Sequence, residues 1–588
     1  MSSLGYPDWN YPQVATTACH FIFYASIRPV LVVVQLASPP LDNGKETGDV
    51  MQVENIDSVN AESGAAEDSG NEAGDFHWDY NVLSNLFSLC IVLFTATWAN
   101  TIPVSAIPFI ALRFPAEAST VSWIATAATT TGAVVLTVVG DISDIFGCRS
   151  FLVFGAAIGG VGQIVSGRAS FGILATPAIQ EMVPKNRRAN VTAAIMILNS
   201  ASFVGTPILE GLFIQKKLGG ELEGWRIGFY IGLVLYALEA IVILLFYHPM
   251  DCPNPEGLSV TTRLRRLDWI GAFLGCSGIS LFPVGMNSGG SQFPWDSSTV
   301  LGTIISGAGL LALFIIWEWK GTSNGILPHA LWKDRNFTIS LIARVVGGFA
   351  LLGSQAFLPQ IVVIIFSTDG LMTAVWQLPS SISSILGAVL AALMLTTLQE
   401  VRLIVIILAC MLALGVASSL MGLAVGAEAA VLGVISGLTV PHEIIATAIS
   451  VSTAGTYIGG AIAATMYSRI YSFKIKVLLP AAIAKAALGA GLSQADLTDF
   501  LQAYLAGDEA VLATLPGVGA TILSIVTKAS KNAYAKSFTY IWYALLAWCG
   551  LSIVIAMMYT STKHYFTNEV IAPVQESKGS GAKTSNSK

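Results

Sequence analysis

The chain has 588 residues, of which 54% are hydrophobic and 11% are charged, and its formal net charge is −6 at pH 7. Soluble proteins carry roughly 25% charged residues, and the mean hydropathy here is +0.68. Most of the chain is therefore expected to lie in a lipid bilayer. The small acidic charge and the lack of a basic stripe argue against a nucleic-acid partner.

The sequence gives no basis for an enzyme. Its seven cysteines are scattered and mostly lie within or beside apolar segments, so neither a disulfide framework nor a metal site is indicated. No nucleophile–base pair, nucleotide-binding loop or metal-ligand spacing occurs in the sequence. We therefore predict no catalytic residues, no metal and no cofactor.

Residues 1–80 are expected to form a disordered N-terminal extension, because their second half is polar, acidic and rich in Gly, Ser and Asn. Residues 17–38 are apolar but are interrupted by a histidine, an arginine and a proline. This pattern predicts an interfacial segment or a mistaken start site, with Met51 as the alternative beginning. It is not typical of a signal peptide, because the basic residue lies inside the apolar run.

Thirteen further segments are long and apolar enough to cross about 30 Å of hydrocarbon, which takes roughly 20 residues of helix. They are residues 84–111, 119–139, 150–168, 189–214, 227–247, 268–287, 299–318, 337–366, 372–396, 401–420, 423–440, 443–472 and 537–560. The organisation predicted from them is an N-terminal half at 81–250, two linker helices at 251–320, the first part of a C-terminal half at 321–472, a long extracytoplasmic loop with short helices at 473–536, the last helix at 537–560 and a cytoplasmic tail at 561–588.

The segment at 170–184 decides the topology. It has only about 15 residues, or ~22 Å of helix. If it crosses, and the N-terminus is inside, the short cytoplasmic loops hold most of the basic residues, including Arg263, Arg265 and Arg266. If it does not cross, this cluster moves to the outside, against the positive-inside rule. Fourteen spans are therefore predicted, with a short fourth one.

The turn between the second and third spans reads Gly140-Asp-Ile-Ser-Asp-Ile-Phe-Gly-Cys-Arg149. Two membrane helices reverse direction here, and glycines permit the tight backbone angles that this requires. Asp144 and Arg149 can pair with each other or with helix ends at the cytoplasmic surface. With Gly140, Asp144, Gly147 and Arg149 on the expected positions, the stretch resembles the signature loop of the major facilitator superfamily.

Further motifs narrow this resemblance. They are Trp225-Arg226, Phe246-Tyr247-His248-Pro249, Leu267-Asp268-Trp269-Ile270-Gly271, Gly285-Met286-Asn287-Ser288-Gly289-Gly290, Phe357-Leu358-Pro359-Gln360 and Leu515-Pro516-Gly517-Val518. Over residues 80–572 the chain resembles fungal fourteen-helix transporters of the trichothecene efflux pump type, whose relatives include siderophore–iron transporters. The resemblance implies an all-α polytopic membrane protein with the major facilitator fold: two six-helix halves of inverted three-helix repeats plus two extra helices.

Two departures from the family pattern bear on activity. The fourth helix is truncated, because Arg168-Ala169 runs directly into Ser170-Phe171-Gly172 and about half of the helix is missing. A lost exon or splicing error in the gene model would explain this, as would a genuine shortening. In the first helix, Ala99 stands where drug/proton antiporters often carry an acid, so that proton carrier is absent.

Two acids within spans are candidate proton or substrate groups, since ionisable residues in a membrane are expensive. Glu210 follows a Gly/Pro cluster in the fifth helix; the alternative is that it is simply solvated near the outer end. Glu239 lies deeper, in the sixth helix, where desolvation suits a proton carrier; the alternative is a residue without a role that faces a water-filled vestibule.

Gln355 and Gln360 flank Pro359 near an expected helix break, where polar groups are reasonable hydrogen-bond partners for a substrate. Arg344, in the ninth helix, is expected to snorkel to the cytoplasmic interface. Small residues that let helices approach closely are expected to serve packing. These are Gly205, Pro207 and Gly211 in the fifth helix and Gly455 and Gly459 in the penultimate one.

The function implied by the resemblance is secondary active transport, with proton-coupled efflux of a small organic toxin or drug as the leading hypothesis. Uptake of a ferric siderophore is an alternative. A further alternative, of another class, is an inactive or sensor-like membrane protein, because of the truncated fourth helix. The expected partners are a small-molecule substrate, the lipid bilayer and protons as coupling ion, with the protein a monomer in the plasma membrane.

Overall fold

The computed structural model describes residues 80–114, 118–164, 188–220, 223–248, 259–290, 292–322, 325–366, 369–398, 400–414, 418–440, 444–506 and 509–565. Within these ranges every regular element is a helix, apart from an isolated bridge between Gly289 and Phe293, so the predicted all-α class is confirmed. Ten of the described helices are long and apolar enough to cross a membrane. The predicted N-terminal extension up to residue 79 and the short fourth span at 170–184 lie outside the described residues.

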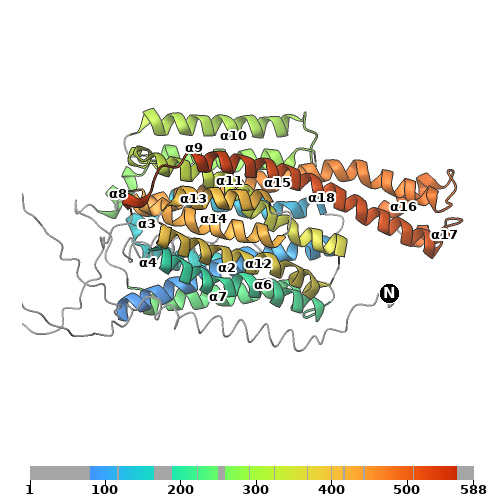
Figure 1. Ribbon diagram of the computed structural model, residues 1–588, viewed down its shortest axis with the longest axis horizontal. Coiled ribbons are helices and arrows are strands. Elements are labelled where there is room, and N and C mark those ends of the chain that lie inside the picture. Colours follow the sequence, from blue (N-terminus) through green and yellow to red (C-terminus); the bar gives the residue numbers. More distant parts are fainter. Residues whose placement is uncertain are drawn as a thin grey trace, which may run out of the picture.

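The N-terminal half is built of five described helices. They are α2 (Tyr80–Arg113), α3 (Ala118–Phe146), α4 (Cys148–Ile164), α6 (Arg188–Gln215) and α7 (Trp225–Phe246). Helix α7 packs against α2, α4 and α6, and these helices lie together in the lower part of Figure 1.

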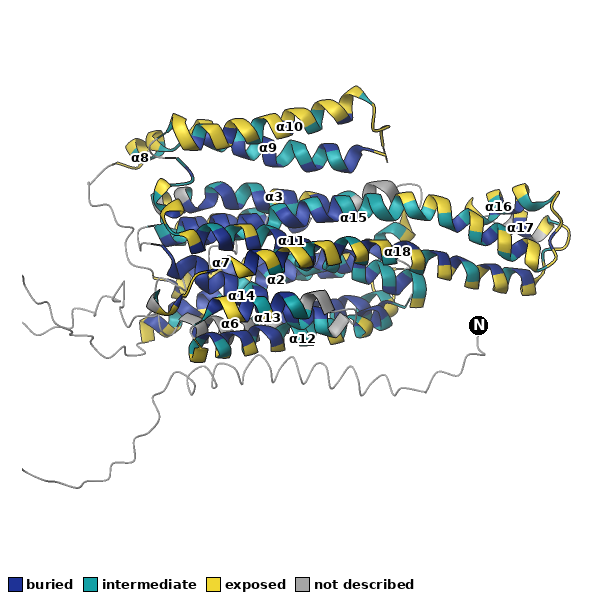
Figure 2. Cartoon of the chain, turned by 45° about the horizontal axis from the view of Figure 1, so that its top comes forward, coloured by how far each residue is buried: buried dark blue, intermediate teal, exposed yellow. Residues whose placement is uncertain are grey.

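The linker begins with the short α8 (Val260–Arg266) and forms a helical hairpin of α9 (Trp269–Ser288) and α10 (Ser298–Ile316), which widens into the π-helical turn η3 (Trp317–Gly321). Side chains cap the starts of both hairpin helices: Asp268 accepts a hydrogen bond from the Gly271 N–H, and Ser297 accepts one from the Val300 N–H. Helix α9 packs on α3 and α15, whereas α10 contacts mainly α9 and is exposed over most of its length (Figure 2).

The C-terminal half supplies the remaining helices. They are η4 (His329–Lys333), α11 (Arg335–Ile361) with the π-helical η5 (Val362–Phe366), α12 (Gly370–Leu398), α13 (Val401–Leu414), α14 (Ser418–Leu438), α15 (Ile445–Gly489), α16 (Leu497–Ala506), α17 (Glu509–Thr514), α18 (Ala520–Met557) and η7 (Lys563–Tyr565). All thirteen predicted spans overlap a described helix. The two halves meet where α6 packs along α12 and where α3 packs along α15.

The segment 473–536, predicted as a long loop with short helices, is mainly helical over its described residues. Helix α15 continues to Gly489 and α18 begins at Ala520, so both helices extend past the predicted spans and project from the bundle with α16 and α17 (Figure 1). An apolar cluster that includes Leu479, Ile483 and Phe500 holds this extension together. The segment is rich in lysine and alanine, which are good helix formers in water.

The signature stretch is also more helical than the predicted loop. Helix α3 continues to Phe146 and α4 starts at Cys148, so Gly147, with φ of +84°, is the whole connection. A left-handed backbone of this kind favours glycine because it has no Cβ. A single glycine therefore makes the reversal that was expected to take several residues.

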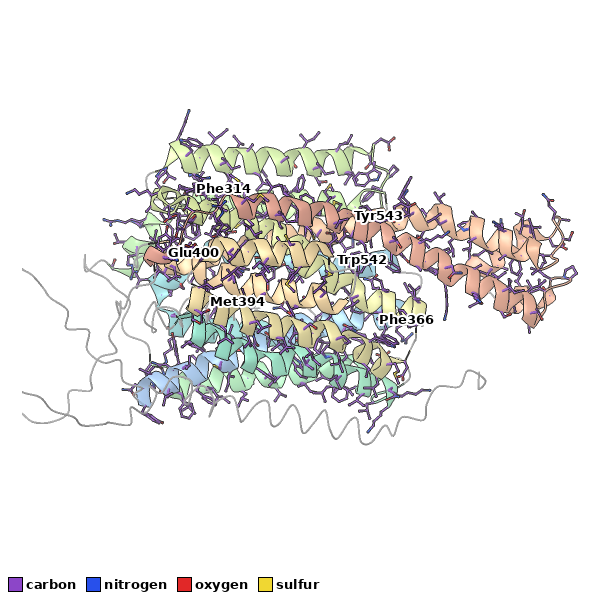
Figure 3. All side chains as sticks on the ribbon, in the orientation of Figure 1. Phe314, Phe366, Met394, Glu400, Trp542 and Tyr543 are labelled. Carbon is purple, nitrogen blue, oxygen red and sulfur yellow. The ribbon has the colours of Figure 1, made fainter. Side chains whose placement is uncertain are left out.

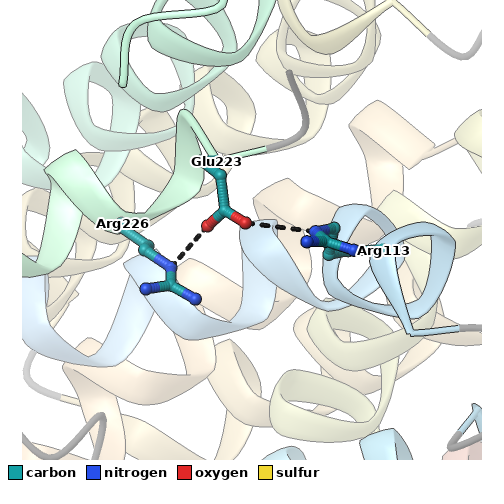
Figure 4. A network of polar contacts seen from close by, with 3 residues as sticks. All are labelled: Arg113, Glu223 and Arg226. Carbon is teal, nitrogen blue, oxygen red and sulfur yellow. Dashed lines mark hydrogen bonds and ion pairs between the residues drawn. The ribbon is translucent and has the colours of Figure 1, made fainter. Parts of the chain in front are cut away.

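Polar contacts fix the two ends of the bundle. We call the end with α16 and α17 the outer end, following the predicted topology. There, the Glu223 carboxylate pairs with Arg113 at the end of α2 (3.1 Å) and with Arg226 in the first turn of α7 (2.6 Å; Figure 4). All three side chains are partly exposed, so each pair stabilises the fold by about 0.2–1 kcal/mol.

At the opposite, cytoplasmic end, the chain after α18 folds back onto α11. Asn336 Oδ1 accepts hydrogen bonds from the Thr560 backbone N–H (3.0 Å) and hydroxyl (2.9 Å), and the Tyr559 and Ser340 hydroxyls are 2.9 Å apart. Figure 3 places Glu400, which begins the turn into α13, at this end and Phe366 at the other, so α12 runs the length of the bundle between them.

Candidate functional site

A cavity of about 270 Å³ lies between the two halves. Helices α2, α3 and α6 line it from the N-terminal half, and α11, α12, α14 and α15 line it from the C-terminal half. The polar lining residues are Thr97, Asn100, Thr101, Ser105, Thr129, Ser354, Gln355, Gln377, Ser380, Ser381, Ser384 and Tyr457. Apolar side chains such as Phe203, Leu352 and Met421 cover the rest of the wall.

The chemistry of this wall is polar but uncharged. Hydroxyls and carboxamides both donate and accept hydrogen bonds, whereas no lining residue in the described part of the chain carries a charge. Several hydroxyls are already engaged with their own helix: Thr101 donates to the Thr97 carbonyl and Ser105 to the Thr101 carbonyl. Their oxygen lone pairs stay available as acceptors, so the wall can bind an uncharged molecule with an apolar body and a few polar groups.

The halves touch each other at both ends of the cavity. At the outer end, α6 and the start of α12 are so close that a Cβ added at Gly211 would lie 2.5 Å from the Gly370 carbonyl oxygen. The Gln215 carboxamide donates to Asp369 there (3.2 Å). At the cytoplasmic end, a Cβ at Gly140 would lie 3.2 Å from the Thr447 Cα of α15, so Gly140 of the signature stretch serves contact between the halves.

Asp369 precedes the first turn of α12 and is half-buried. Its carboxylate accepts a hydrogen bond from the Leu371 N–H (3.3 Å) as well as from Gln215. Burial raises the pKa of this carboxyl, and the backbone hydrogen bonds from Leu371 and Met372 offset part of that rise. The outer contact between the halves therefore contains a titratable group.

Glu210 is buried, with 1% of its surface exposed, so the alternative that it is simply solvated is wrong. Among the described residues, neither of its carboxylate oxygens has a hydrogen-bond partner. It lies on α6 between Pro207, which lines the cavity, and Gly211, which contacts α12. Glu210 does not itself line the cavity.

Glu239 is also buried, at 2% exposure, and does not face the cavity, so the alternative of a water-filled vestibule is wrong as well. Its side chain approaches the Thr95 hydroxyl of α2, which has no hydrogen-bond partner among the described residues. One helical turn along α2 from Thr95 lies Ala99, which packs with Tyr236 and Ala240 of α7 in one apolar cluster. The carboxyl of Glu239 thus lies next to the position where an acid on the first helix was expected and is absent.

The two glutamines of α11 are placed differently. Gln355 lines the cavity, whereas Gln360 donates to the Ala356 carbonyl of its own helix (2.9 Å) and is not part of the wall. The expected helix break at Pro359 is absent, because α11 continues to Ile361 and then widens into π-helix η5. Proline has no N–H to donate, and the widened turn accommodates the shifted hydrogen-bond ladder.

The predicted packing residues lie at close helix contacts. A Cβ at Gly459 would lie 1.9 Å from the Val345 carbonyl oxygen of α11, whereas one at Gly455 would lie 3.2 Å from the end of the Leu341 side chain. Gly205 is buried in α6, and Pro207 lines the cavity.

In the signature stretch, Arg149 donates to the Leu244 carbonyl at the end of α7 (2.6 Å). The predicted pairing of Arg149 with Asp144 cannot be placed, because the Asp144 side chain lies outside the described residues. Two contacts were expected for Arg149, one with Asp144 and one with a helix end. In the described part of the chain, Arg149 makes the contact with a helix end.

The C-terminal half holds a buried acid, Glu428, that was not among the candidates predicted from the sequence. Arg344 does not snorkel to the interface, since its Nε is buried and its Nη2 lies 3.2 Å from where a Cβ at Gly433 of α14 would be. It interacts electrostatically with Glu428, a buried acid of α14. A lone glutamate within the predicted span at 423–440 was the signal for this pair, but its partner on α11 becomes visible only in the folded chain.

Comparison with known proteins agrees with the motif analysis. A family model described as the fungal trichothecene efflux pump (TRI12) matches residues 51–583. The trichothecene efflux pump TRI12 of Fusarium sporotrichioides is 27% identical over 506 residues, which cover 79% of this chain and 84% of that protein. The MFS-type transporter pigP of Monascus ruber is 29% identical over 229 residues, which cover 38% of this chain and 39% of that one.

Among solved structures, a bacterial homologue of the human lysosomal transporter Spinster, in an inward-facing and occupied conformation, covers 79% of this chain and 96% of its own. The identity is 14% and the TM-score is 0.45.

Proposed function

The chain belongs to the fungal trichothecene efflux pump (TRI12) family of major facilitator transporters, and from that premise we propose that it exports a small, uncharged organic toxin or drug in exchange for protons. The observation that carries the proposal is the cavity between the two halves, whose described wall offers hydroxyls and carboxamides but no charge. In this proposal, the halves rock about the cavity so that it opens to each side in turn.

The wall chemistry favours the uncharged class of substrate. Moving an ion into an uncharged, partly apolar cavity would remove its hydration without supplying a counter-charge. A neutral molecule that carries ester, ether or hydroxyl oxygens can instead accept hydrogen bonds from the carboxamides of Asn100, Gln355 and Gln377, while Phe203 and Met421 cover its apolar body.

Glu239 is the group that we propose to carry the coupling proton in the N-terminal half. It is buried against α2 at Thr95, one turn from Ala99. In drug/proton antiporters, the acid next to this position often comes from the first helix. In this chain, Glu239 of α7 supplies a carboxyl to the same region between α2 and α7. Glu210 is the second candidate, because its unpartnered carboxyl lies between the cavity wall and the outer contact.

The proposal is tested by expressing the full chain in yeast cells that lack their own drug exporters. We expect these cells to hold less of a radiolabelled trichothecene than cells with empty vector, and to lose the difference when a protonophore collapses the proton gradient. Export from cells also requires the plasma membrane, which we propose as the location, and microscopy of a tagged chain reports it directly.

Two outcomes would refute the proposal. Equal accumulation in both strains would show that the chain does not export this class of compound, as expected for an inactive or sensor-like protein. Higher accumulation of a labelled ferric siderophore in the expressing cells would support uptake instead.

A cavity variant, Gln355→Ala, is expected to weaken export about tenfold, because a buried hydrogen bond to the substrate is lost.

A further inference from the structure

The C-terminal half contains an acid, Glu428, and a base, Arg344, that lie close to the cavity without lining it. Glu428 of α14 is 8% exposed, and its Oε1 lies 3.0 Å from where a Cβ at Gly347 of α11 would be. Arg344 lies one turn before Gly347 and extends toward α14 at Gly433. Both side chains therefore lie between α11 and α14.

The cavity wall begins one helical turn from this pair. On α14, Val425 lines the cavity and Glu428 lies three residues further toward the cytoplasmic end. On α11, Leu351 lines the cavity and Gly347, against which Glu428 lies, is four residues nearer the cytoplasmic end. The carboxyl is therefore just beneath the cavity, on the cytoplasmic side.

Few other titratable groups face Glu428. Those that interact with it in the described part of the chain are Arg344 of α11, Cys549 of α18 and Tyr559 after α18. Of the other helices packed on α14, α12 has no ionisable residue, α13 has Arg402 in its first turn and Cys410, α15 presents Tyr457 at the cavity, and α6 carries Glu210. Thiols and phenols ordinarily ionise above pH 8 and near pH 10, so Glu428 and Arg344 are the groups of this set that ordinarily carry a charge at neutral pH.

A buried pair of this kind is a poor way to stabilise a helix bundle. Desolvation of the two charges offsets much of their attraction, and apolar residues of similar size often stabilise a fold as well or better. Arg344 Nε has no hydrogen-bond partner among the described residues, so the pair is not fully satisfied. A role other than stability is therefore expected for these two residues. The Glu428 carboxylate can be neutralised either by Arg344 or by a proton.

We propose that Glu428 is a second proton-binding carboxyl of the transport cycle, located in the C-terminal half, and that Arg344 is the positive charge that replaces its proton. When the cavity faces outward, the carboxylate accepts a proton and releases Arg344. When the cavity faces the cytoplasm, the proton leaves to that side and Arg344 pairs with the carboxylate again. The proposal rests on the proposed function, and it adds one proton per substrate to the proton carried by Glu239.

The structure provides a reporter for this site that needs no substrate. Trp548 stacks on Phe349 of α11, with ring centroids 4.0 Å apart, and precedes Cys549, which interacts with Glu428. Purified full-length protein in detergent would be titrated from pH 4 to pH 9 by tryptophan fluorescence, and the titration of Trp548→Phe would be subtracted. We expect the difference to show one step in the wild type, none in Glu428→Gln, and an unchanged step in Glu239→Gln.

Two fluorescence results would overturn the proposal: no step in the wild type, or a step that persists in Glu428→Gln. Since Glu428→Gln leaves Arg344 buried without its counter-charge and can impair folding, the double variant Arg344→Gln/Glu428→Gln is the second test. It removes both charges, and it too should lack the step.

Transport then separates this proposal from the proposed function. In liposomes loaded with a radiolabelled trichothecene, the pH gradient that just balances a known substrate gradient gives the number of protons per substrate. We expect Glu428→Gln to lower that number by one, and the surface variant Glu400→Gln to leave it unchanged. An unchanged number in Glu428→Gln overturns the second proton site alone, whereas a wild type that moves no trichothecene overturns the proposed function.

Discussion

Replacing Gly211 by alanine should shift the protein away from the conformation in which its halves touch at the outer end. The added methyl would lie 2.5 Å from the Gly370 carbonyl oxygen, 2.8 Å from its carbonyl carbon and 3.0 Å from the Leu371 Cα. All three are backbone atoms, which cannot rotate away as a side chain does. Since non-bonded carbon contacts are ordinarily about 3.5–4 Å, α6 and α12 must move apart by roughly 1 Å.

The cost of such overpacking is typically about 1–3 kcal/mol. A conformation in which α6 and α12 separate at this end does not bear that cost. The equilibrium between the conformation with α6 and α12 in contact at the outer end and the conformation with them apart should therefore shift toward the latter. A cost of about 1–3 kcal/mol corresponds to a shift of about 5–150-fold.

Cross-linking measures this shift directly. Cysteines would replace Gln215 and Asp369, whose side chains are 3.2 Å apart, in a background without native cysteines, and a short bis-maleimide would join them. The rate should fall in Gly211→Ala. Gly309→Ala on α10 is the control, because an added Cβ there meets no atom within 4 Å. Equal rates in the two variants would refute the assignment of Gly211 and Gly370 to a contact that opens during transport.

Three further predictions follow from the described contacts. Glu239→Gln should lower gradient-driven transport at least about tenfold and leave substrate exchange at equal pH intact; loss of both activities would point to a binding or folding defect. Burial raises the pKa of Asp369, so the folded chain keeps a proton that the unfolded chain has released. The stability conferred by that proton is lost as pH rises through the folded pKa, and Tm should fall less over this range in Asp369→Asn than in the wild type. Asn336→Ala removes the acceptor of both Thr560 hydrogen bonds and should lower stability by about 1–3 kcal/mol; a Tm equal to that of Glu400→Gln would contradict this.

Hydropathy placed thirteen predicted spans on described helices, ten of which are long and apolar enough to cross a membrane, because length and apolar content are local properties of the sequence. It failed for residues 473–489, over which α15 continues past the predicted span, since the criterion for a span ends where the chain becomes polar, whereas a helix of lysine and alanine continues in water. The π-helical turn after Pro359 was missed for a related reason. The sequence shows that Pro359 removes one hydrogen bond from the backbone of the helix. Packing against other helices decides whether the helix then breaks or widens into a π-helical turn.

The site was predicted only in part, because its residues are brought together from seven helices. The sequence shows that Gln355 and Gln360 are both polar residues in a span, but it does not show that one faces the cavity and the other bonds to its own helix. In the same way, Arg344 and Glu428 lie on different helices, and each was either misread or missed when taken alone. Pairing across helices depends on rotation and depth, which a single sequence does not specify.

The central claim is proton-coupled export of an uncharged organic molecule, and one flux measurement tests it most directly. Purified full-length protein would be placed in liposomes with a radiolabelled trichothecene outside, and the pH of the lumen would be set below or above that of the medium. An antiporter should accumulate the label in acidic liposomes, because protons that leave the lumen drive substrate in. The label should not accumulate in alkaline liposomes or after a protonophore is added. Equal uptake under both gradients would contradict proton exchange.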